Sequence, residues 1–146
     1  MFNNRPLEKA IASVISASYA SNGVTGWDIV TSFSTGSIGG SGNNPVVEIV
    51  CGNAEPMMPY NRLGYSKIPV TVATVAVKTI TTATEFETVS DFTFDPFLAD
   101  NGLTNLSSYA PTLIIKSVVD NGLNVTSVND VWMATQDLEI IVGRAS

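Results

Sequence analysis

Two runs with strong β propensity, separated by one turn-rich loop, constrain the fold of this chain more than any other feature. The first run is Val46 to Cys51 and the second is Ile68 to Val77. Both are dominated by β-branched residues, which fit a pleated and packed surface. The loop between them is rich in Pro, Asn and Gly and is too short for a helical crossover with its turns. The two runs are therefore predicted to form an antiparallel pair at the centre of a sheet.

The second run breaks its own alternation once. Its apolar residues occupy even positions up to Val72 and odd positions from Val75 onward. Such a slip fits a strand with both faces covered, and it fits a bulge near Ala73 and Thr74 equally well.

An apolar stripe near the start of the chain predicts an amphipathic helix, which Asn3 or Asn4 can cap and which Asn22-Gly23 can end. The stripe consists of Leu7, Ala10, Ile11, Val14, Ile15 and Tyr19. The alternative is a signal peptide, but serines interrupt the apolar stretch that such a peptide needs.

The sequence leaves the structure of the next segment open and predicts a loop for the segment after it. Val24 to Phe33 fits a short strand or a helical turn anchored by Trp27 and Ile29. Ser34 to Asn44 is rich in Gly, Ser and Asn and has little to bury, so it is expected to be a flexible loop. It lacks the Lys-Ser or Lys-Thr pair of a phosphate-binding loop. The residues proposed for an assembly contact in this loop are Ile38, Gly39 and Gly40.

Thr84 to Leu98 predicts a second helix that begins at a capping Thr84. Pro96 cannot lie in a helix interior, so a break is expected near Phe94. Asp95-Pro96 is expected to start another turn that ends at Asn101-Gly102, and Leu103 to Ala110 fits a third short helix.

The last third of the chain returns to strands. Thr112 to Val119 is one strand, Asp120-Asn121-Gly122 is the predicted hairpin turn, and Leu123 to Asp130 is ambiguous. Val131 to Val142 is the closing strand. Its alternation puts Trp132, Ala134, Leu138, Ile140 and Val142 on one face and Thr135, Asp137 and Glu139 on the other.

These elements predict one α+β domain over residues 1–146, with a flexible loop at 34–44. Its sheet is expected to be mainly antiparallel, with four strands or slightly more. The N-terminal helix and the second helix are expected to pack on one side of this sheet.

Charge and residue usage exclude several classes of function. The net charge is −6 and no Lys or Arg cluster is present, which argues against a face that binds DNA or anionic membranes. There is no His, and the single Cys, Cys51, lies in an apolar strand as a small hydrophobe. No run approaches the roughly 20 apolar residues of a membrane span. We therefore expect no enzyme activity, cofactor, metal or membrane partner.

The strongest charge asymmetry in the chain is a long segment that contains acidic residues but no basic ones. Thr79 to Ile115 contains no Lys or Arg. Its acidic residues can bind a cation, act as an acid–base pair through Glu87 and Asp91, form a solvated helix face, or line a channel that repels phosphate. The candidates for a channel-facing or interface surface are Glu85, Glu87, Asp91, Asp95, Asp137 and Glu139.

The order of elements resembles the tail terminator or tail completion proteins of long-tailed bacteriophages. The resemblance spans nearly the whole chain and rests chiefly on Cys51 to Glu55, Pro69 to Val77 and Trp132 to Val142. It implies a protomer that assembles into a ring, a hexamer if it follows the family, on the end of the tail tube. Families of this kind have no catalytic residues. The chain departs from the pattern at Ser34 to Asn44 and Asp95 to Ala110, so contacts there cannot be carried over.

The expected function is that of a virion structural protein that caps the tail tube and joins it to the head or neck. Its partners would be copies of itself, the tail tube protein and the head–tail connector, with DNA only passing through the lumen. It would be made in the host cytoplasm and reside in the virion. The alternatives are another connector or completion protein of the neck and, on the signal-peptide interpretation, a secreted β-rich binding module.

Overall fold

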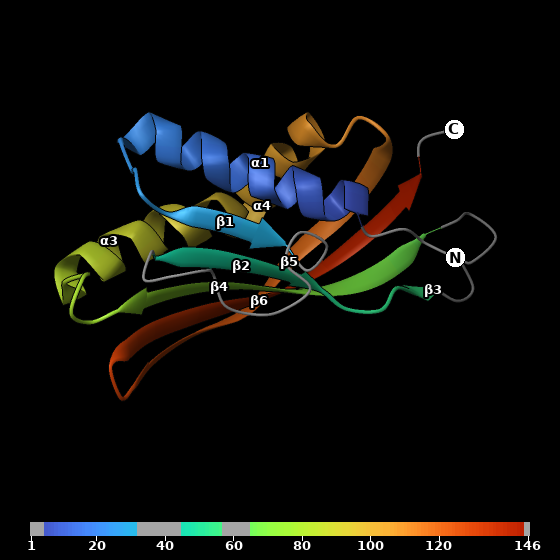
Figure 1. Ribbon diagram of the computed structural model, residues 1–146. Helices are drawn as coiled ribbons and strands as arrows, with labels where there is room; N and C mark the ends of the chain where they lie inside the picture. Colours follow the sequence, from blue (N-terminus) through green and yellow to red (C-terminus); the bar gives the residue numbers. More distant parts are fainter. Residues whose placement is uncertain (1–4, 32–44, 57–64, 145–146) are drawn as a thin grey trace.

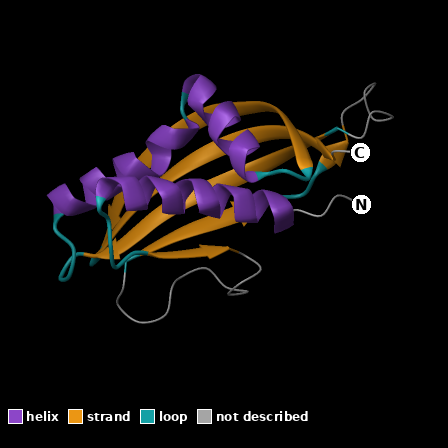
Figure 2. Ribbon diagram, turned by 90° about the horizontal axis from the view of Figure 1, so that it is seen from above, coloured by secondary structure: helices purple, strands orange, loops and turns teal. Residues whose placement is uncertain are grey.

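The computed structural model describes residues 5–31, 45–56 and 65–144, which form one layer of helices on one layer of sheet (Figure 1). The helices are α1 (Arg5–Asn22), α3 (Ala83–Phe94), the 3-10 turn η2 (Asp95–Phe97) and α4 (Ala99–Tyr109). Figure 2 shows that they all lie on the same face of the sheet. The α+β class and the one-sided helix layer predicted from the sequence are confirmed.

The sheet is mixed but mainly antiparallel. Its strands are β1 (Asp28–Thr31), β2 (Val46–Cys51), β3 (Glu55–Pro56), β4 (Ser66–Val77), β5 (Leu113–Val128) and β6 (Val131–Arg144). The spatial order is β1-β2-β4-β6-β5, and β3 also pairs with β4. Among the described strands, only β1 and β2 pair in parallel. The main order has five strands rather than four, because the ambiguous segment after α1 supplies β1.

The N-terminal helix forms as its apolar spacing predicts. Every residue of the predicted stripe is at most 5% exposed. The helix ends at Asn22, and Gly23 follows with a φ of +71°, a value that glycine adopts without strain. The predicted cap at Asn3 or Asn4 lies outside the described residues.

The irregular alternation in β4 is not a bulge. The pairing of β4 with β2 and β6 continues without a register shift through Ala73 and Thr74. Thr74 lies on the core face, where its hydroxyl is 2.9 Å from the hydroxyl of Ser90 in α3. Ala73 is buried on the opposite face. The apparent slip therefore comes from a hydrogen-bonded Thr in the core together with partial cover of the second face.

The second helix begins two residues earlier than predicted. Thr82, not Thr84, caps α3, since its side-chain oxygen accepts the N–H of Glu85 at 3.2 Å. The helix stops at Phe94 because Pro96 follows, as predicted, and η2 continues the chain.

The predicted stop at Asn101-Gly102 is wrong. Gly102 lies inside α4, which begins at Ala99. A Cβ on Gly102 would lie 2.9 Å from the carbonyl oxygen of Phe97 and 2.9 Å from Cγ1 of Val118. This glycine therefore serves the close packing of α4 on η2 and β5 rather than the end of a helix.

The predicted hairpin turn at Asp120-Asn121-Gly122 is also wrong. The pairing of β5 with β6 continues across this site with a register shift between Asp120 and Gly122, which is a bulge. Oδ1 of Asp120 accepts the N–H of Gly122 at 3.0 Å. The actual turn is Asn129-Asp130, where Asn129 has a φ of +53°. β5 is therefore 16 residues long and contains the ambiguous segment as far as Val128.

Some predictions lie outside the described residues. The loop at 34–44, with the assembly candidates Ile38, Gly39 and Gly40, is among them. Within the described part of the chain, no helix has the length and apolarity needed to cross a membrane.

Candidate functional site

The acidic face of α3 is the first of two candidate surfaces. Phe86, Val89 and Phe94 turn toward the sheet and are buried, so the helix presents Glu87 and Asp91 outward, one turn apart. Glu85 is also exposed and lies in the first turn, where its charge favours the positive end of the helix dipole. The face is solvated, so like charges four residues apart cost only a few tenths of a kcal/mol, on the order of 0.2–0.5.

Asp95 extends this acidic face into η2. Partial burial, with a further contribution from the charge of Asp91, raises the pKa of the Asp95 carboxyl above its ordinary value. No ion pair among the described residues involves any of the four carboxylates of α3 and η2. Glu85, Glu87, Asp91 and Asp95 are all exposed, and their role on a channel or interface surface stays a prediction.

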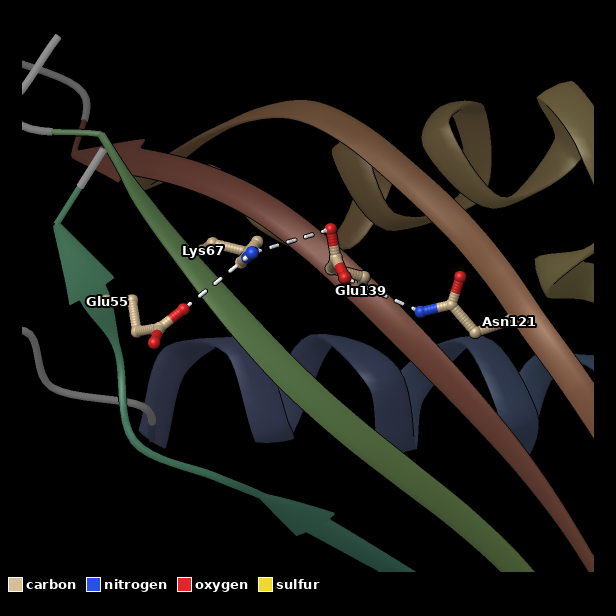
Figure 3. Close-up of polar contacts among 4 residues, drawn as sticks. All are labelled: Glu55, Lys67, Asn121 and Glu139. Atoms are coloured by element: carbon tan, nitrogen blue, oxygen red, sulfur yellow. Dashed lines mark hydrogen bonds and ion pairs between the residues drawn. The ribbon is translucent and has the colours of Figure 1, made fainter. Parts of the chain in front are cut away.

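A polar row crosses the opposite face of the sheet. Figure 3 shows Glu55 of β3, Lys67 of β4, Glu139 of β6 and Asn121 of β5 side by side, with α1 on the far side of the strands. Lys67 Nζ lies 3.7 Å from Oε2 of Glu55 and 4.0 Å from Oε1 of Glu139. Asn121 Nδ2 donates to Oε2 of Glu139 at 3.5 Å. The β5 bulge places Asn121 in reach of this row.

Asp137 belongs to the same face. It is exposed, and its Oδ1 accepts a hydrogen bond from the hydroxyl of Thr71 at 3.0 Å. Asp137 and Glu139 thus share one face of the sheet, as predicted. This face is opposite to the helix layer that carries Glu87 and Asp91. The six acidic candidates form two separate surfaces, and a single channel wall cannot contain both.

The charged side chains of the polar row are exposed to solvent. The side chains of Lys67 and Glu139 are each 38% exposed and that of Glu55 is 71% exposed, so the ion pairs are worth at most about 1 kcal/mol. No group of three or more potential metal ligands occurs within the described residues. The arrangement can stabilise the sheet and present charge.

Cys51 is a poor nucleophile. It is partly buried against the core at the end of β2. Burial, with a further contribution from the nearby Glu8 carboxylate, raises the pKa of its thiol to about 12. The thiol therefore stays protonated at neutral pH.

The sequence interpretation missed a third surface, the second half of β5. Leu123 and Val125 are 55% and 62% exposed, the two highest values among the exposed large hydrophobic side chains of the described residues. They lie opposite Gln136 and Ala134 of β6, on the face that carries the helices. The sequence does contain a sign of this surface, because residues 121–128 carry no charged side chain. The run was not recognised as part of one strand because a turn was predicted at Asn121-Gly122. We call residues 121–128 the bare segment.

Comparison of the chain with models of known protein families finds no match, and comparison with curated proteins finds none either.

Proposed function

We propose that this chain is a virion structural protein that forms a homo-oligomeric ring on the end of a bacteriophage tail tube and joins the tail to the head or neck. Three features support the proposal: the order of elements, the helix layer on one side of a mainly antiparallel sheet, and surfaces suited to self-association. The ring is a hexamer if it follows the resemblance. Its further partners are the tail tube protein and the head–tail connector.

The observation that carries the proposal is the exposed edge of the sheet. β5 is 16 residues long, and no described strand pairs with its outer side. Leu123 and Val125 are exposed on this strand, and the bare segment has none of the charged residues or prolines that commonly protect edge strands. Such an edge in a solitary protein invites association, so burial by another subunit is the natural explanation.

The acidic face of α3 is proposed to line the passage for DNA. Glu87 and Asp91 are exposed without an ion pair among the described residues, whereas Glu139 shares Lys67 with Glu55. Carboxylates repel the phosphate backbone, so a wall of this kind would let DNA slide without binding it. Since Asp137 and Glu139 lie on the other face, they are assigned to the outside of the ring.

The runner-up is a head completion or connector protein of the same particle. The experiment that tests the proposal is to isolate tails before they join heads, and heads before they join tails, and to probe both for the chain. A terminator is expected on the joining end of free tails. Presence on free heads alone would favour the runner-up, and absence from both would contradict a role in the neck.

A further inference from the structure

We infer that the ring interface joins the outer edge of β5 in one copy to the outer edge of β1 in the next, so that one sheet runs through neighbouring subunits. The inference rests on the proposed ring and names its contact. The occupant of the β5 edge is thus a second copy of this chain.

The strand order supplies the first argument. β1 and β5 are the two ends of the five-strand order, and no described strand pairs with the outer side of either. An edge strand offers a row of backbone N–H and C=O groups, and another strand satisfies them best. Joining β5 to β1 of the next copy uses each end of the five-strand order once. Pairing β5 with β5 of a second copy would leave both β1 edges open.

Strand direction gives the second argument. β1 runs parallel to β2, and the three steps from β2 through β4 and β6 to β5 each reverse the direction. β5 therefore runs opposite to β1. Rotation about an axis along the strands keeps their directions, so the new pair is antiparallel, the pairing that dominates this sheet. The same rotation keeps the helices of every copy on one side.

The position of the helices gives the third argument. α4 packs against β5 at Val118, and α3 packs on β4 and β6, which leaves Leu123 and Val125 on the helix-bearing face without cover. α1 packs on β1 and β2 on that same face. In a continuous sheet, α1 of the next copy lies beside Leu123 and Val125 and buries them. The helix layer becomes as continuous as the sheet.

Charge permits the contact. The bare segment has no charged side chain, and β1 carries only Asp28. Two chains of net charge −6 repel each other, so a contact between copies is favoured where neither side adds like charges.

Cysteine cross-linking tests the contact. Asn124 and Thr126 are exposed on the face opposite the helices. Asp28 is exposed on the same face, because it pairs with Val46, which lies on that face beside Val75 of β4. Single variants Asp28→Cys, Asn124→Cys and Thr126→Cys are made in a Cys51→Ala background, concentrated, mixed in pairs and oxidised mildly. Directly opposite residues of an antiparallel pair have Cβ atoms about 4.5–5.5 Å apart, close to the reach of a disulfide.

The expected result is a covalent dimer in a mixture of D28C with N124C or T126C, and none from any single variant alone. Dimers of N124C or T126C alone would mean a two-fold β5–β5 contact and would overturn the inference. Leu123→Lys and Val125→Lys together should abolish the oligomer, while Ile80→Lys, a control at a 53% exposed position outside the sheet, should leave it intact.

The outcomes separate this inference from the proposed function. A ring that persists in the double Lys variant and gives no mixed cross-link would overturn the β5–β1 contact and leave the ring standing. Circular dichroism of the Lys variant, which changes only exposed side chains, must match that of the wild type. If concentrated wild-type protein shows no oligomer larger than a dimer, the ring and the contact both fail.

Discussion

The hydroxyl of Tyr19 in α1 donates a hydrogen bond to Oγ1 of Thr93 in α3. The direction follows from a second bond, in which the Thr93 hydroxyl gives its own proton to the carbonyl of Val89 at 2.7 Å. Tyr19 is 5% exposed and Thr93 is fully buried. This buried bond joins the two helices, and the hydroxyl of Ser18 in α1 adds a half-buried hydrogen bond to the carbonyl of Phe92 in α3 at 2.7 Å.

Removal of either partner should therefore destabilise the domain by unequal amounts. Tyr19→Phe removes the donor and should cost about 0.5–1.5 kcal/mol, whereas Thr93→Val leaves the buried Tyr19 hydroxyl without its acceptor and should cost about 1–3 kcal/mol. Urea unfolding of the single and double variants measures both values and their coupling. Thr88→Val is the matched control, because Thr88 bonds only the carbonyl of Thr84 on an exposed face. Costs that simply add would contradict the pairing.

Tyr19 should also make the fold sensitive to alkali. Burial raises the pKa of the Tyr19 phenol to about 12, against about 10 in the unfolded chain. The folded state thus holds this proton more tightly. The resulting stabilisation is complete below pH about 10 and is lost as the pH rises through about 12, a change of roughly 2–3 kcal/mol.

Unfolding free energies measured from pH 8 to 12 test this dependence. The stability of the wild type should fall relative to that of Tyr19→Phe as the pH rises. Tyr109→Phe, at a 45% exposed position, should follow the wild-type curve. Parallel curves for wild type and Tyr19→Phe would show that the phenol does not control alkaline stability.

Gly102 should tolerate no side chain. In an ordinary helix interior, Gly→Ala gains about 1 kcal/mol of helix propensity. Here the added methyl group meets the Phe97 carbonyl oxygen, which is backbone and cannot turn away, so Gly102→Ala should destabilise the domain by about 1–3 kcal/mol. The neighbouring exposed Asn101→Ala is the control and should be neutral or slightly stabilising. Thermal unfolding decides, and a Gly102→Ala variant as stable as the wild type would contradict the packing at this site.

If the proposed ring forms around DNA, reversal of charge on α3 should increase the retention of DNA in it. Glu87→Lys with Asp91→Lys replaces two exposed carboxylates, so assembly should survive while DNA retention at low salt increases. Asp137→Lys with Glu139→Lys makes the same charge change on the opposite face and is the control. Loss of the ring in the α3 variant with no change in DNA retention would place this face at a subunit contact instead.

Local patterns in the sequence were sufficient for much of the fold, because the interactions that decide them are local. The stripe of α1 and the break before Pro96 depend on residues within one or two turns. The predicted turn at Asn121-Gly122 and the predicted helix stop at Gly102 were wrong because Asn and Gly occur in turns, in bulges and at close packing contacts. Only the distant residues that they contact distinguish these cases. The Gly102 site depends on Val118, which lies in another element.

The candidate site was predictable only in part, for the same reason. Residue spacing placed Glu87 and Asp91 on one helix face, and alternation placed Asp137 and Glu139 on one strand face. The two pairs lie on opposite sides of the molecule because the helices cover only one face of the sheet. This arrangement cannot be deduced from a local sequence pattern. The exposure of Leu123 and Val125 depends on where the helix layer ends.

Native mass spectrometry of the concentrated protein counts the copies in one assembly and so tests directly whether this chain forms a ring. A single closed oligomer larger than a dimer is expected, and a hexamer if the proposed tail-terminator role holds. This oligomer should dissociate to monomers when Leu123 and Val125 are replaced by Lys. Only monomers or two-fold dimers at every concentration, and in the particle itself, would contradict the proposed ring.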